Sequence, residues 1–165
     1  MVVAICVLLL VCFSLVGAVY FYKLTHGPTA LRTGFKAKIF LTSNEVEFYH
    51  RLQKACESRL VIMAQVSLGA LVDTKLDKAH SRYWETRAAF SSKIIDYVLC
   101  DPISLKPLIL IELDDKMHDF DKDRVRDSFT AFAGFKTLRF WSKNKPQSDA
   151  LRAEILKALG ILAAK

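Results

Sequence analysis

The chain has 165 residues, a mass of 18.7 kDa and a net charge of +7, with 24 basic and 17 acidic side chains. Charged residues make up 25% of the chain, a composition that excludes a disordered chain, a collagen-like repeat and a polytopic transporter. The first charged side chain is Lys23. About 140 residues follow the apolar leader, which is enough for one domain with a core and too few for two.

The leader is nearly free of polar side chains. Residues 2–22 read VVAICVLLLVCFSLVGAVYFY, in which Ser14 is the one clearly polar side chain. About 20 apolar residues cross the hydrocarbon core of a bilayer as a helix. Tyr20 and Tyr22 match the aromatic belt at a membrane interface. The sequence therefore predicts a transmembrane helix over residues 1–23, with the membrane contacted through residues 2–22.

A basic tether follows over residues 24–40. No acidic residue occurs before Glu45, and the positive-inside rule then favours a single-pass protein of the cell inner membrane with its domain on the cytoplasmic side. The alternative is an exported domain whose signal peptide is cleaved near Gly17-Ala18. The missing basic segment at the N-terminus speaks against a signal peptide.

Cysteine usage agrees with a reducing compartment. Only Cys56 and Cys100 lie in the domain, without CxxC spacing, and this pattern predicts two buried free thiols. A single disulfide stays an alternative for the exported domain.

The domain, over residues 41–165, opens with a helix that runs to about Ser58. Thr42 and Glu45 have the spacing of a capping box. Four apolar runs rich in branched residues then predict strands, and the third run predicts a central strand because it is almost wholly apolar. The runs cover residues 60–67, 93–100, 107–114 and 136–141. Residues 68–90 predict mostly irregular structure. Two further helices are expected, over residues 122–133 and after Pro146.

Three acidic side chains fall within the apolar strands. Asp96 lies in the middle of the second, and Glu112 and Asp114 share one face of the third because strand side chains alternate. Converging carboxylates repel one another and lose hydration. A divalent cation such as Mg²⁺ neutralises such a group, and it polarises phosphates and activates water.

Four segments in this order resemble a known family. They read LTSNEVEF, KIIDYVLCD, LILIELDDKMH and VRDSFTAFAGFKTLRFW. The chain resembles a bacterial domain family of unknown function in the restriction-endonuclease-like PD-(D/E)XK superfamily, near the very-short-patch-repair-like endonucleases. The resemblance covers residues 41–141. It implies an α/β fold with an α-β-β-β-α-β core, a mixed sheet flanked by helices, which is the order expected from the periodicity.

The resemblance also implies roles for individual residues. Asp96 and Glu112 take the places of the metal-binding acids, with Mg²⁺ or Mn²⁺ as cofactor. Asp114 stands where the superfamily usually has lysine, and it becomes an additional metal ligand or a supporting acid. His118 becomes the general acid or base, because its pKa lies near neutrality. Glu45 on the preceding helix completes the candidate catalytic set.

Each acid also has a purely structural explanation. Glu45 is accounted for by the capping box alone. Asp96 can be a hydrogen-bonded polar group within its strand, Glu112 and Asp114 can form a solvated strand end, and His118 can be structural. The string Asp119-x-Asp121-x-Asp123 begins like a calcium loop but lacks the required glycine and glutamate, so calcium is set aside.

The charge distribution favours a polyanionic partner. Residues 23–59 carry seven basic and three acidic side chains, and residues 119–165 carry ten and six, around a centre with seven and eight. Such flanks suit contact with a phosphate backbone, DNA being favoured over RNA, although anionic lipid attracts the same charges. The predicted nucleic-acid contacts are Arg126, Arg139 and Lys93. The sequence does not indicate an oligomeric state.

Two functions are consistent with these observations. The first is a membrane-tethered, divalent-metal-dependent nuclease that cleaves DNA phosphodiester bonds. The alternative is a catalytically inactive module of the same fold that binds nucleic acid or a protein partner at the membrane. The two differ in whether the acids bind a metal productively without the usual lysine.

Overall fold

The computed structural model describes residues 2–26, 35–115 and 128–161. The chain divides into two compact units, Met1–Phe40 and Leu41–Lys165.

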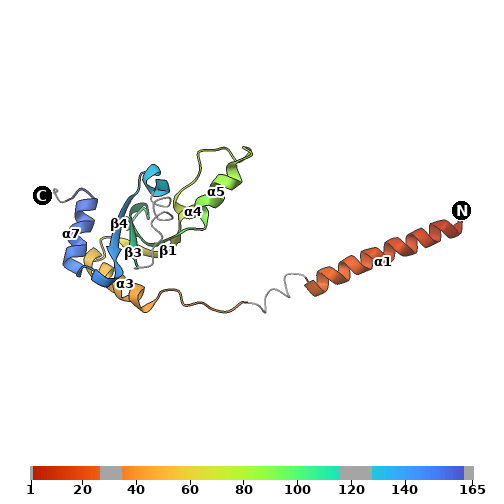
Figure 1. The fold of residues 1–165 in the computed structure, drawn as a ribbon, viewed down its shortest axis with the longest axis horizontal. Coiled ribbons are helices and arrows are strands. Elements are labelled where there is room, and N and C mark those ends of the chain that lie inside the picture. The colour runs from red at the N-terminus through yellow and green to blue at the C-terminus, as the bar shows by residue number, and fades with distance from the viewer. Residues whose placement is uncertain (1, 27–34, 116–127, 162–165) are drawn as a thin grey trace. The chain divides into compact units, whose positions relative to one another are not determined.

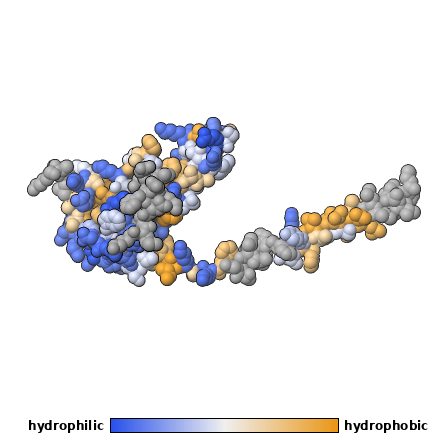
Figure 2. All heavy atoms as spheres, viewed as in Figure 1, coloured by the Kyte–Doolittle hydropathy of each residue, from blue (hydrophilic) through white to orange (hydrophobic). Residues whose placement is uncertain are grey.

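The first unit contains one long helix, α1 (Val2–His26), in the region of the predicted leader. The side chains described in it, from Leu9 to Thr25, are all exposed, and most are apolar (Figure 2). Among the described residues, however, no helix combines the length and apolar character needed to cross a membrane. The predicted membrane anchor and its orientation stay predictions.

The second unit is built on a four-stranded mixed sheet (Figure 1). Its strands are β1 (Val61–Ser67), β2 (Ile94–Cys100), β3 (Pro107–Asp114) and β4 (Lys136–Trp141), in the spatial order β1-β2-β3-β4. The first three strands are antiparallel neighbours, and β3 pairs with β4 in parallel. The four predicted strands are confirmed, and the nearly apolar β3 occupies an interior position as expected.

Two helices, α3 (Ser43–Cys56) and α7 (Ser148–Ala158), cover one face of the sheet (Figure 1). Phe48, Leu52, Leu151 and Ile155 pack in one cluster with the side chains that β2, β3 and β4 direct to this side. A short 3-10 helix, η2 (Ser142–Asn144), joins β4 to the chain leading into α7. We call this side the α3–α7 face.

The capping box predicted for α3 is present. The Thr42 side chain accepts a hydrogen bond from the backbone N–H of Glu45, and the Glu45 carboxylate accepts one from the backbone N–H of Thr42 at 2.6 Å. These two bonds satisfy backbone donors that have no partner within the helix.

Replacing Thr42 by alanine should lower the free energy of unfolding by about 1 kcal/mol, because it removes the cap acceptor. Urea denaturation checks this. Thr42→Ser, which keeps the hydroxyl, should stay within a few tenths of a kcal/mol of the unmodified protein. Equal stability of Thr42→Ala and Thr42→Ser would contradict the assignment.

The opposite face carries α4 (Leu68–Leu71) and α5 (Tyr83–Ser91) (Figure 1). The prediction of mostly irregular structure over residues 68–90 is therefore wrong for these two segments. Within the mixed charges of α5, Tyr83 and Phe90 are buried two helical turns apart, a stripe too narrow to stand out in the sequence. Gly69 allows close approach, because a Cβ there would lie 2.8 Å from the Cβ of Ser91.

The connection from β3 to β4 is described only in its second part. Residues 128–132 are helical, and Gly134 follows with a φ of +83°. The backbone N–H of Phe135 donates to the carbonyl of Thr130 at 2.9 Å, which closes the helix end in the way the glycine predicted. The first part of the helix predicted over residues 122–133 lies outside the described residues.

Candidate functional site

The sheet face under α4 and α5 carries the predicted acids. Tyr97 of β2 pairs with Ile111 of β3 in antiparallel register, and Asp96 and Glu112 are the residues next to this last pair. Glu112 in turn pairs with Arg139 of β4 in parallel register. We call Asp96, Glu112 and Arg139 the acid row; Glu112 and Arg139, as cross-strand partners, point to the same side of the sheet. We call this side the acid face.

Burial differs along the row. Glu112 is 2% exposed and Asp114, two residues further along β3, is 6% exposed. Asp96 is only partly buried. The row therefore runs from an accessible carboxylate on β2 to a buried one on β3.

A backbone contact holds the Asp96 carboxylate against β3. Its Oδ2 atom accepts a hydrogen bond from the backbone N–H of Leu113 at 2.8 Å. Leu113 is the residue between Glu112 and Asp114. The bond therefore holds the β2 carboxylate against the β3 backbone between these two acids.

Asp114 and Arg139 form a two-pronged ion pair. The Nε and Nη2 atoms of Arg139 donate to the two carboxylate oxygens of Asp114 at 2.8 and 2.7 Å. Two parallel N–H···O bonds make this the strongest common geometry for such a pair. The pair accounts for the burial of Asp114 and places the Arg139 guanidinium at the end of the acid row.

The acids of this face are candidate ligands for a divalent cation. Across the described parts of the chain, no three His, Cys, Asp or Glu side chains gather into a metal-binding group. Asp114 is bound to Arg139, and its predicted role as a metal ligand stays a prediction beside those of Asp96 and Glu112. Two carboxylates fit Mg²⁺, which proteins commonly hold through one or two carboxylates together with substrate phosphates and water.

Glu45 lies in the first turn of α3. Its carboxylate caps the helix and accepts a hydrogen bond from the side-chain amide of Gln65 at 3.0 Å. Its catalytic role beside the acid row stays a prediction. The Tyr97 hydroxyl donates to the Glu45 carbonyl at 2.6 Å. Burial raises the pKa of the Tyr97 phenol above its usual range, and the negative charges of Glu45 and Asp96 raise it further.

The other predicted residues are placed only in part. His118 and Arg126 lie outside the described residues, so their roles stay predictions. Lys93 is partly buried just before β2, and its carbonyl accepts a hydrogen bond from the backbone N–H of Leu68 at 2.7 Å. The backbone of Lys93 therefore joins α4 to β2, and its contact with nucleic acid stays a prediction.

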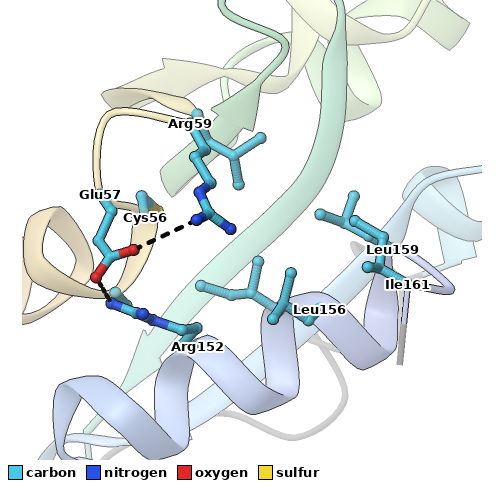
Figure 3. A pocket seen from close by; sticks show the side chains of 10 residues that line it. Cys56, Glu57, Arg59, Arg152, Leu156, Leu159 and Ile161 are labelled. Atoms are coloured by element: carbon cyan, nitrogen blue, oxygen red, sulfur yellow. Dashed lines mark ion pairs between the residues drawn. The ribbon is translucent and has the colours of Figure 1, made fainter. Parts of the chain in front are cut away.

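An apolar pocket of about 170 Å³ lies on the α3–α7 face (Figure 3). Its lining includes the apolar side chains of Leu60, Ile155, Leu156, Leu159 and Ile161. At its rim Glu57 forms ion pairs with Arg59 and Arg152 (Figure 3). Because α3 and α7 enclose it, the pocket is separated by the sheet from the acid face.

Cys56 lines this pocket as a buried free thiol, and Cys100 is also free and buried, which confirms the prediction for both. Burial raises the pKa of the Cys56 thiol to about 11, partly offset by the charge of Arg152. The folded-state pKa lies above that of the unfolded chain. The thiol's contribution to stability is therefore complete below about pH 9 and is lost as the pH rises toward 11.

In the variant Cys6→Ser/Cys12→Ser, which retains Cys56 and Cys100, we expect Cys56 to react slowly with a thiol reagent at pH 8. A rise of two pKa units lowers the thiolate fraction about a hundredfold relative to an ordinary thiol. The reaction should become fast in urea. Complete reaction of both thiols at equal rates in the native and unfolded states would contradict the assigned burial.

The ion pair between Asp114 and Arg139 is the feature of this site that sequence reasoning missed. The sequence predicted Arg139 as a phosphate contact, and the structure shows it in an ion pair with a buried carboxylate. The spacing of the residues could have predicted this pair. In a parallel strand pair, an arginine aligned with Glu112 also lies within reach of Asp114, two residues further along β3.

Comparison with known proteins identifies a family and no characterised relative. A family model described as "Protein of unknown function (DUF2726)" matches residues 37–163. No curated protein and no solved structure gives a match. The matched residues cover the whole sheet and all the helices of the second unit. The chain therefore belongs to the DUF2726 family of proteins of unknown function.

Proposed function

We propose that the second unit is a nuclease-like domain of the PD-(D/E)XK type that hydrolyses DNA phosphodiester bonds with a divalent metal ion. The observation that carries the proposal is the hydrogen bond from the backbone N–H of Leu113 to the Asp96 carboxylate, which holds Asp96 of β2 against the residue between Glu112 and Asp114 of β3. We further propose that residues 2–22 tether the domain to the inner membrane on its cytoplasmic side. Export after signal cleavage is the alternative.

The topology supports this fold assignment. A helix precedes three antiparallel strands, with α4 and α5 inserted between the first two; a helical segment follows, and the last strand joins in parallel beside β3. Apart from the inserted α4 and α5, this is the α-β-β-β-α-β order that the resemblance implies. The candidate acids fall on the second and third strands of that order, where the superfamily pattern requires them.

The chemistry of the acid row supports metal-assisted hydrolysis. Asp96 and Glu112 each lie next to the paired residues Tyr97 and Ile111, and carboxylates on neighbouring strands repel each other, a repulsion that a bound cation would offset. The Leu113 N–H holds Asp96 in that position. A bound Mg²⁺ or Mn²⁺ would polarise the phosphate and lower the pKa of a water molecule.

Arg139 supports a phosphate at this site. Its guanidinium is aligned with Glu112 and bonded to Asp114 through two of its five N–H groups. A cationic group beside the metal ligands favours the negative charge that develops on a phosphate during hydrolysis. The excess of basic residues before residue 60 and after residue 118 favours a nucleic-acid backbone as the source of that phosphate.

One observation favours the alternative, a module of the same fold that binds nucleic acid or a protein partner without cleavage. Asp114 stands where the superfamily usually has lysine, and its carboxylate forms an ion pair with Arg139. An arrangement neutralised in this way is stable without metal.

The proposal is tested by incubating the full chain in detergent with plasmid, linear and single-stranded DNA in the presence of Mg²⁺, Mn²⁺ or EDTA. We expect cleavage with Mg²⁺ or Mn²⁺ and none with EDTA. Cleavage that persists in EDTA, or no cleavage of any substrate, would contradict the nuclease. In the second case, salt-sensitive DNA binding would support the binding module.

A further inference from the structure

Residues 35–40, in the first unit, are an exposed segment in which apolar and cationic side chains alternate. The segment reads Phe35-Lys36-Ala37-Lys38-Ile39-Phe40 and forms no helix or strand. Phe35 and Ile39 are each 79% exposed and Phe40 is 68% exposed. Single exposed apolar side chains are normal on a protein, but large ones gathered in one short segment mark an interaction surface.

The charge of the surrounding chain indicates the kind of partner. Residues 1–44 contain no acidic side chain, while Lys23, Arg32, Lys36 and Lys38 are cationic. A cationic segment of this kind is attracted to the negative surface of a bilayer that contains anionic lipids. Each lysine held near such a surface strengthens binding by a factor of about five.

The apolar side chains favour lipid over nucleic acid. Aromatic rings settle at the level of the lipid headgroups, and lysine stems lie along apolar surface while their ammonium groups stay in water. Ile39 has no aromatic face on which a base could stack. Its burial requires hydrocarbon, which a phosphate backbone does not offer.

We propose that residues 35–40 bind in the interfacial layer of an anionic lipid bilayer, with Phe35, Ile39 and Phe40 inserted at the headgroup boundary and Lys36 and Lys38 facing the lipid phosphates. This lipid-binding segment goes beyond the proposed nuclease function. It rests on residues 35–40 and on the charge of the first 44 residues, and it does not require α1 to cross the bilayer.

A tryptophan introduced by Phe40→Trp reports on the segment in the full chain. The background is Trp84→Phe/Trp141→Phe, two sites that are 66% and 52% exposed, so the core stays intact. The protein is mixed with vesicles whose lipids carry brominated acyl chains, made either of phosphatidylcholine or of an equal mixture with phosphatidylglycerol. We expect strong quenching in the mixed vesicles and much weaker quenching in the neutral ones.

The lysines provide the matched comparison. Lys36→Gln/Lys38→Gln should weaken the apparent affinity of the segment for the mixed vesicles by about thirtyfold, while Lys75→Gln/Lys78→Gln, at exposed positions in the second unit, should leave it unchanged. Equal quenching in both kinds of vesicle, no quenching in either, or a response to duplex DNA in place of vesicles would overturn the proposal. None of these readouts depends on metal or DNA cleavage.

Discussion

Glu112→Gln and Asp96→Asn should each lower metal-dependent DNA cleavage by about a thousandfold while the protein stays folded. Both substitutions keep the shape of the side chain and remove the charge that would hold the cation. The electrostatic stabilisation that a metal supplies amounts to several kcal/mol, which corresponds to a loss of this size. The measurement is the initial rate of plasmid cleavage with Mg²⁺ at a fixed protein concentration.

The matched controls are Glu154→Gln and Asp149→Asn, which make the same chemical changes at exposed positions of α7 on the other side of the sheet. They should cleave at the rate of the unmodified protein. Circular dichroism confirms folding. If the substitutions in the acid row and on α7 had equal effects, the assignment of the acid row as the catalytic site would be wrong.

Arg139→Met should lower the free energy of unfolding by about 2–3 kcal/mol. It leaves the Asp114 carboxylate, which is 6% exposed, without the guanidinium that neutralises it. Removing one partner of a fully buried ion pair costs about 3–5 kcal/mol. We expect a smaller loss here because the Arg139 side chain is 27% exposed. The midpoint of urea denaturation, followed by tryptophan fluorescence, measures the loss.

The double variant Asp114→Leu/Arg139→Met should recover most of that stability, because it removes both charges together. The comparison separates a lost ion pair from a lost packing contact. Equal destabilisation in the single and double variants would show that the Arg139 side chain stabilises β4 through packing alone.

Local patterns in the sequence predict much of the fold. The capping box at Thr42, the branched apolar runs of the strands and Gly134 at a helix end each act through neighbouring residues. Such interactions are readable from the chain order. The two helices between β1 and β2 were not predicted, because only Tyr83 and Phe90 of α5 are buried, and Phe90 packs against side chains of β2 and β3.

For the candidate site, the sequence predicts the part that depends on the alternation of side chains along a strand. Alternation places Glu112 and Asp114 on one face, and the strand order makes β2, which carries Asp96, the neighbour of β3. The partners of these acids depend on contacts between separate strands. The bond from the Leu113 N–H to Asp96 and the ion pair of Asp114 with Arg139 join residues 17 and 25 positions apart, which no local pattern specifies.

The central claim is that Asp96 and Glu112 together hold a divalent cation. Mn²⁺ binding, followed by the loss of the free-ion signal in electron paramagnetic resonance, tests it on the full chain without reliance on cleavage. We predict one Mn²⁺ site per chain in the presence of a DNA oligonucleotide, and its loss in Asp96→Asn/Glu112→Gln. No bound Mn²⁺, or equal binding by the double variant, would contradict the account.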